Sequence, residues 1–104
     1  MATLLRTARA KERRVYVPAM CVAEWWRGRT DLREKILEWV TVVHTDDALL
    51  KVTGEALAEI PTATAVDAIV MATAARHGPI VFTSDVEDLQ RLQKAFRAVR
   101  VLAA

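Results

Sequence analysis

The alternation of short apolar strands with helical segments is the feature that most restricts how this chain can fold. Residues 15–17, 41–44, 80–82 and 99–102 are rich in β-branched or other apolar residues and are expected to be strands. The segments between them carry apolar residues at helical spacing, and no Asn-Gly or Asp-Gly pair marks a hairpin. Strands that are joined by helices form parallel sheets through right-handed crossovers. The sequence therefore predicts an α/β fold with a short, mostly parallel sheet flanked by helices.

Helices are expected over residues 19–27, 31–40, 46–60, 65–77 and 86–97, and residues 2–10 have a weaker helical pattern. Asp46 or Asp47 is a suitable N-cap for the third of these helices. Gly78 is expected to end the fourth in a left-handed conformation. The apolar positions expected to face inward are Leu49, Leu50, Val52, Ala56 and Leu57 in the third helix, and Leu89, Leu92 and Phe96 in the last.

The size and composition of the chain predict a single globular domain over residues 1–104. The only cysteine is Cys21, which excludes an internal disulfide framework and suits a reducing compartment. No uncharged apolar run is long enough to span a bilayer, and the N-terminus lacks the apolar core of a signal peptide. A cytoplasmic protein without membrane contact is therefore expected.

The charged residues are unevenly distributed along the chain. Residues 1–35 hold nine Lys/Arg and four Asp/Glu, a balance of +5, and residues 36–104 hold six and nine, a balance of −3. This distribution suits a polyanionic partner that is attracted by the basic half and reaches an acidic centre. The alternative is that the basic residues only form solvated helix faces.

Three carboxylates are expected near the carboxyl ends of the strands. Glu24 follows the first strand, Asp67 lies in the first turn of an apolar helix and is expected to be buried, and Asp85 follows the third strand. Sites in parallel sheets form at these strand ends, so the fold can bring the three residues together. Clustered carboxylates repel each other unless a hard cation such as Mg²⁺ or Mn²⁺ compensates them. Such a metal site can activate water for attack on a phosphate.

Each of these acids also has a purely structural interpretation. Thr64 and Asp67 have the spacing of a helix-capping box, and Asp85 and Asp88 have the spacing of another cap. Glu24 can form an ion pair with Arg27 one turn further on. Acids at helix N-termini are common because the helix dipole favours them there. Spacing alone leaves both interpretations open.

The segments VYVPAMCVAEWWRG, VDAIVMATAARHG and IVFTSDVEDL, in this order, resemble the PIN-domain family, specifically the VapC-type ribonuclease toxins of bacterial toxin–antitoxin pairs. The resemblance covers nearly the whole chain from about Leu4. It implies a three-layer PIN-like fold and Mg²⁺- or Mn²⁺-dependent cleavage of RNA, restrained by a cognate antitoxin. It also implies catalytic and metal-binding roles for Glu24, Asp67 and Asp85, with Thr83 and Asp88 beside them.

The chain departs from the family pattern at its start. The family opens with a strand that carries an aspartate, whereas no Asp precedes Asp31 here. An N-terminally truncated PIN-like domain, with weakened metal binding and activity, is therefore expected. The missing strand would leave unpaired strand edges, which a second copy can cover by edge pairing or strand swapping in a homodimer.

Two further expectations concern partners and alternative functions. Arg27, Arg29 and Arg33 follow Glu24 and can hold RNA phosphates, although they can equally be solvated charges. A non-catalytic module that binds antitoxin or self-associates is the main alternative to the ribonuclease. A phospho-receiver-like domain is less suitable, because it needs a lysine at a late strand end and Lys94 lies inside the expected last helix.

Overall fold

The computed structural model of this chain describes residues 6, 14–26 and 30–104. It contains helices and short parallel strands, which confirms the mixed α/β class. The chain divides into two compact units, Met1–His44 and Thr45–Ala104. No helix in the described part of the chain is long and apolar enough to cross a membrane.

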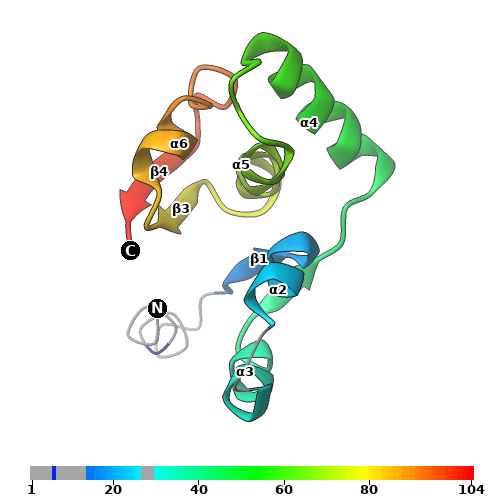
Figure 1. Ribbon diagram of the computed structural model, residues 1–104, viewed down its shortest axis with the longest axis vertical. Helices are drawn as coiled ribbons and strands as arrows, with labels where there is room; N and C mark the ends of the chain where they lie inside the picture. Colours follow the sequence, from blue (N-terminus) through cyan, green and yellow to red (C-terminus); the bar gives the residue numbers. More distant parts are fainter. Residues whose placement is uncertain (1–5, 7–13, 27–29) are drawn as a thin grey trace. The chain divides into compact units, whose positions relative to one another are not determined.

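The N-terminal unit contains a two-stranded parallel sheet (Figure 1). Tyr16 pairs with Thr41 and Pro18 with Val43, so the strands are in register along their full length. Pro18 suits the junction that it occupies, because it ends the first strand and is also the N-cap of the next helix. The elements are β1 (Tyr16–Pro18), α2 (Ala19–Trp25), α3 (Thr30–Leu37) and β2 (Thr41–Val43).

The C-terminal unit contains a second two-stranded parallel sheet, on which helices pack. Helix α5 packs against α4, α6 and β3, and α6 also packs against β4 (Figure 1). Within the described residues β1 pairs with β2 and β3 pairs with β4, in two separate sheets. The sequence predicts one sheet. The elements are α4 (Asp47–Glu59), α5 (Ala65–His77), β3 (Ile80–Thr83), α6 (Val86–Gln90) and β4 (Arg100–Ala103).

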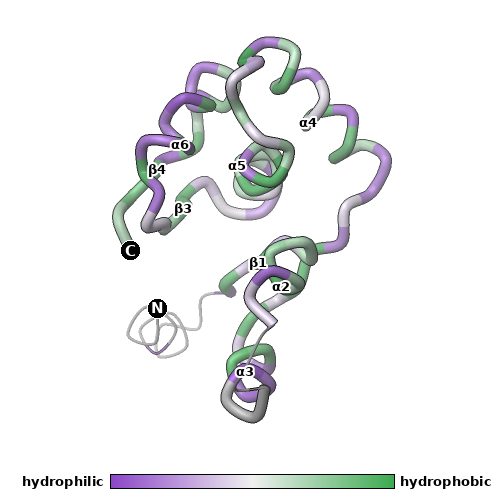
Figure 2. Tube along the Cα trace, viewed as in Figure 1, coloured by the Kyte–Doolittle hydropathy of each residue, from purple (hydrophilic) through white to green (hydrophobic). Residues whose placement is uncertain are grey.

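The core of the C-terminal unit lies between the helices and one face of the β3–β4 sheet. Val81 and Val101, which are register partners, are buried in it together with residues of all three helices. Figure 2 shows hydrophobic residues around most of the circumference of α5, as expected for a helix that packs on several neighbours. The most deeply buried side chains of the core include Leu49, Ala68, Met71, Leu92 and Val99.

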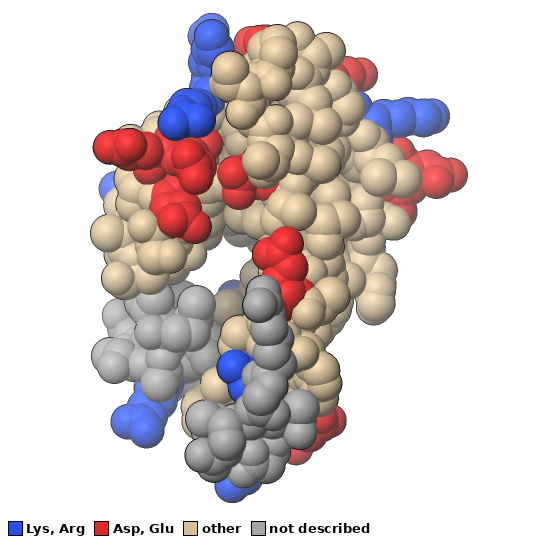
Figure 3. Space-filling model, in the orientation of Figure 1, with Lys and Arg blue, Asp and Glu red and all other residues tan. Residues whose placement is uncertain are grey.

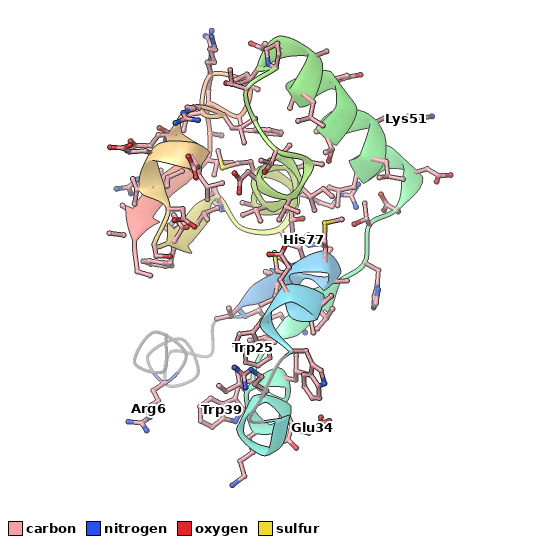
Figure 4. The ribbon with its side chains drawn as sticks, in the orientation of Figure 1. Arg6, Trp25, Glu34, Trp39, Lys51 and His77 are labelled. Carbon is pink, nitrogen blue, oxygen red and sulfur yellow. The ribbon has the colours of Figure 1, made fainter. Side chains whose placement is uncertain are left out.

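The expected inward face of α4 is partly wrong. Leu49 and Ala56 are buried, but Leu50 is 53% exposed and Val52 is 41% exposed. Thr53 takes the inward position, four residues after Leu49, because residues at that spacing share one helix face. Its hydroxyl donates a 2.8 Å hydrogen bond to the carbonyl of Leu49, which satisfies the buried polar group. Lys51 extends outward from the same helix (Figure 4).

Two expected helix ends also need correction. Gly78 has φ −168°, an extended conformation that any residue can adopt, so the expected left-handed stop is wrong. The expected helix over 86–97 is regular only through Gln90. Turns with hydrogen bonds between residues three apart follow it, for example from the Leu92 amide to the Leu89 carbonyl. These tighter turns still bury Leu89, Leu92 and Phe96, as the sequence predicts.

Candidate functional site

Asp85 lies at the junction between β3 and α6, where the sequence predicts it. It occupies the N-cap position of α6, but its side chain makes no capping hydrogen bond. The exposed Asp85 carboxylate therefore does not cap α6, although Asp is a favourable N-cap residue. Its oxygens remain available for another ligand at the carboxyl end of a strand.

Thr83 fixes the backbone that carries Asp85. The Asp85 amide donates a 2.9 Å hydrogen bond to the Thr83 hydroxyl. This contact closes a local turn directly after the strand, because a short side chain accepts from the backbone two residues on. Thr83 is half-buried, so its position is set by the sheet. The expected hydroxyl beside Asp85 is thus present.

An open depression of about 340 Å³ lies beside this junction, and its lining residues are Ser84, Asp85, Val86, Glu87 and Asp88. Figure 3 shows acidic side chains gathered over α6. Asp88 is partly compensated, because its carboxylate lies 3.6 Å from the Arg91 guanidinium on the surface. The depression is therefore acidic and solvent-accessible, and it is open enough to admit a hydrated cation.

Asp67 lies in the first turn of α5, as expected, and is half-buried rather than buried. Its amide donates a 3.2 Å hydrogen bond to the Thr64 hydroxyl, which is the helix N-cap. This hydrogen bond confirms one half of the predicted capping box, in which the N-cap side chain accepts from a backbone amide, here that of Asp67. Within the described residues, no hydrogen bond or ion pair to the Asp67 carboxylate is found.

Glu24 lies near the end of α2 and is exposed. It belongs to the N-terminal unit, whereas Asp67 and Asp85 belong to the C-terminal unit. Asp67 and Asp85 occupy similar positions. Each lies at the start of a helix that packs against a strand of the β3–β4 sheet, α5 against β3 and α6 against β4. In the part of the chain that the structure describes, no three His, Cys, Asp or Glu residues are gathered so that they could hold a metal ion.

The arginines expected to bind RNA are described only in part. Arg27 and Arg29 lie outside the described residues. The guanidinium carbon of Arg33 lies 5.6 Å from the centroid of the Trp25 ring, within the range of a cation–π contact. Its Nε is buried and has no hydrogen-bond partner among the described residues. Arg33 is thus held by an aromatic ring and is not a freely solvated charge.

The sequence interpretation missed two features of the C-terminal unit. Glu87 lines the depression, and the acidic run after the third strand is the signal that identifies it. Asp46 caps α4 and also binds Arg76 through two hydrogen bonds of 2.8 and 3.1 Å. No sequence signal predicts this second contact, because the two residues are thirty positions apart.

No protein-family model, curated protein or solved structure matches this chain significantly. The chemistry of the described residues is therefore the basis for assigning a function.

Proposed function

We propose that this protein is a Mg²⁺-dependent endoribonuclease of the toxin–antitoxin type with a three-layer PIN-like fold. The observation that carries the proposal is the position of the Asp85 carboxylate, together with its lack of a capping hydrogen bond. Its carboxylate follows a parallel strand and lines an open acidic depression, and it does not cap the helix that it precedes. A strand end of this kind is where parallel α/β folds place their ligands.

The donor atoms suit a hard divalent cation. Carboxylate oxygens of Asp85, Asp67 and Glu24, with Asp88 as a further donor, match the oxygen ligands that Mg²⁺ and Mn²⁺ prefer. Bound there, the metal would supply an activated water and stabilise charge on the scissile phosphate. The hydroxyl of Thr83 holds the Asp85 backbone in place for this role.

The remaining parts of the proposal concern Glu24 and the partners. The family resemblance gives Glu24 the role of a further acidic ligand. The basic N-terminal part of the chain, including Arg27, Arg29 and Arg33, attracts the RNA phosphates. A cognate antitoxin restrains the cleavage, and cytoplasmic RNA is the substrate.

The test is Mg²⁺-dependent cleavage of a labelled single-stranded RNA. Asp85→Asn and Asp67→Asn each remove one ligand charge and are expected to abolish cleavage. Asp47→Asn is the matched control, because Asp47 lies in the first turn of α4 as Asp67 lies in that of α5. It removes the same helix-dipole interaction without touching the site. Cleavage that survives in Asp85→Asn, or an equal loss in Asp47→Asn, would contradict the proposal.

A specific observation favours a second function, that of a non-catalytic module that binds an antitoxin. Met20, Trp26 and Trp39 of the N-terminal unit are large hydrophobic residues with 36–40% of their surface exposed. Methionine and tryptophan are enriched at protein interfaces. In Figure 4, Glu34 of α3 and Trp39, which lies in the turn after this helix, extend to opposite sides. Antitoxin binding by a chain that shows neither Mn²⁺ binding nor RNA cleavage would support this alternative.

A further inference from the structure

Positive and negative charges are separated within the C-terminal unit itself. Residues 45–88 hold two Lys/Arg and eight Asp/Glu, a balance of −6, whereas residues 89–104 hold four Lys/Arg and no Asp/Glu, a balance of +4. The acidic depression belongs to the first of these segments, and the second begins inside α6. Figure 3 shows basic side chains directly beside the acidic ones that gather over α6. A basic surface therefore adjoins the candidate site.

Three of these basic residues follow one another at a spacing of three. They are Arg91, Lys94 and Arg97, which are all exposed and form a basic row. The turns that carry them are held mostly by hydrogen bonds between residues three apart, such as that from the Gln93 amide to the Gln90 carbonyl. Backbone of this kind has about three residues per turn, so side chains three apart lie one above the other. In the regular helix that the sequence predicts, the members of the row would be displaced around the helix axis instead.

The basic row starts at the edge of the acidic depression. Asp88 lines the depression, and its carboxylate lies 3.6 Å from the Arg91 guanidinium. From there the chain runs away from the carboxyl end of β3, because β4 is parallel to β3 and the chain has to reach its amino end. Lys94 and Arg97 therefore lie between the depression and the opposite end of the sheet. The row is a track of positive charge that leads to the depression.

The charges of the row are suited to a soluble polyanion. Among the described residues, no acidic side chain forms an ion pair with Lys94 or Arg97. The apolar residues of the same segment, Leu92, Phe96 and Val99, are buried in the core. A helix that binds an anionic membrane places apolar side chains in the lipid beside its basic ones, and the basic row has no such side chains. The remaining candidates are extended anions in solution.

We propose that the basic row binds the phosphate backbone of single-stranded RNA on one side of the cleavage position, a role that rests on the proposed nuclease function. The turns rise about 2 Å per residue, so Arg91 and Arg97 are separated by about 12 Å along the row. A nucleic-acid strand carries a phosphate about every 3.4 Å of helix axis, so the row spans about three to four phosphates. Two of its three members are arginines, whose guanidinium groups bind phosphate through paired hydrogen bonds. Contacts to phosphates position the RNA and read no bases, so this binding is independent of sequence.

The test measures binding of a fluorescein-labelled single-stranded RNA to the full chain by fluorescence anisotropy, in EDTA and at several salt concentrations. Each phosphate contact contributes about −0.7 to the slope of log affinity against log salt concentration. Lys94→Gln and Arg97→Gln are therefore each expected to reduce this slope by about 0.7. The double variant is expected to reduce it by about 1.4 and to weaken binding at low salt by about 10-fold or more. Circular dichroism of each variant shows that it is folded.

Lys51→Gln is the matched control for Lys94→Gln. Lys51 is exposed and lies in the same unit, but it extends outward from α4 (Figure 4). The two substitutions change the net charge equally, and only Lys94→Gln is expected to reduce the slope. An equal reduction in both variants would overturn the proposal, because net charge alone would then explain RNA binding.

Competition identifies the kind of anion that the row binds. Unlabelled RNA is expected to displace the labelled RNA, whereas polyglutamate and vesicles of phosphatidylserine and phosphatidylcholine are expected to displace it much less at equal charge. Equal displacement by polyglutamate would assign the row to an acidic protein, and equal displacement by vesicles would assign it to a membrane surface. Either result, or no RNA binding in EDTA, would overturn the proposal.

The same measurements separate this proposal from the proposed nuclease. EDTA removes divalent cations, so RNA binding is measured without Mg²⁺-dependent cleavage. Binding through the row by a chain that does not cleave RNA in Mg²⁺ would contradict the nuclease only. Cleavage by a chain whose RNA affinity is unchanged in the double variant would overturn the role of the row only.

Discussion

Arg76 in the last turn of α5 donates two hydrogen bonds to Asp46, the N-cap of α4, at 2.8 and 3.1 Å. The same carboxylate accepts a 2.8 Å hydrogen bond from the Leu49 amide. Asp46 therefore satisfies the start of one helix and binds the end of the next. The pair is exposed, so it adds little to overall stability.

This pair predicts a pH-dependent contribution to stability. The Arg76 guanidinium, and next the Leu49 amide, lower the pKa of Asp46 below its ordinary value. A lowered pKa stabilises the folded state above the unfolded value of about 3.9, and this stabilisation is lost as the pH falls through the folded pKa. Asp46→Asn keeps a capping residue but removes the charge. Its melting temperature is expected to lie below that of the unaltered protein at neutral pH and to converge with it in acid.

The control for this experiment is Asp47→Asn, which removes the neighbouring charge in the first turn of the same helix. If Asp47→Asn gives the same convergence in acid as Asp46→Asn, a general change in charge accounts for the effect and the Arg76 pair does not.

The N-cap of α5 predicts a measurable loss when its hydroxyl is removed. Thr64→Ala deletes the 3.2 Å hydrogen bond from the Asp67 amide. The free energy of unfolding is expected to fall by about 1 kcal/mol, the usual cost of losing such a cap. Urea denaturation measures the change, with Thr62→Ala as the control, because Thr62 precedes the helix and is exposed. Equal effects of the two substitutions would show that Thr64 has no specific capping role.

The core of the C-terminal unit predicts a larger effect. Leu92 is completely buried within the cluster formed by the helices and the sheet. Leu92→Ala is expected to lower the free energy of unfolding by about 2–5 kcal/mol, because it removes apolar contacts and leaves a cavity. Leu50→Ala, at a position that is 53% exposed, is expected to change it by less than about 0.5 kcal/mol. Comparable losses from both would mean that Leu50 is buried in solution.

Much of the local structure was predictable because its causes are local. The positions of the strands follow from short β-branched runs, and the caps Asp46 and Thr64 follow from side chains that reach their own backbone. The placement of Thr53 inward and Val52 outward was not predictable from hydrophobicity, because helix geometry and a hydroxyl–carbonyl bond decide it.

The candidate site was predictable only in its separate parts. Asp67 and Asp85 lie at helix starts, as the sequence predicts, since strand and helix boundaries determine these positions. Spacing could not decide whether Asp85 caps its helix or binds a ligand, because aspartate is favoured at helix N-termini in either case. The side-chain geometry decides against capping for Asp85, while the Thr64 hydroxyl does cap α5.

The hydrogen bond from the Asp85 amide to the Thr83 hydroxyl predicts a positioning role for Thr83 in metal binding. Thr83→Val keeps the shape of the side chain but removes the acceptor, so the loop that carries Asp85 loses its local restraint. Because outer partners of metal ligands typically contribute 10- to 100-fold to affinity, Mn²⁺ binding measured by titration calorimetry is expected to weaken by about 10-fold. Thr83→Ser restores the hydroxyl and is expected to restore binding. If Thr83→Val binds Mn²⁺ as tightly as Thr83→Ser, the hydroxyl does not position Asp85.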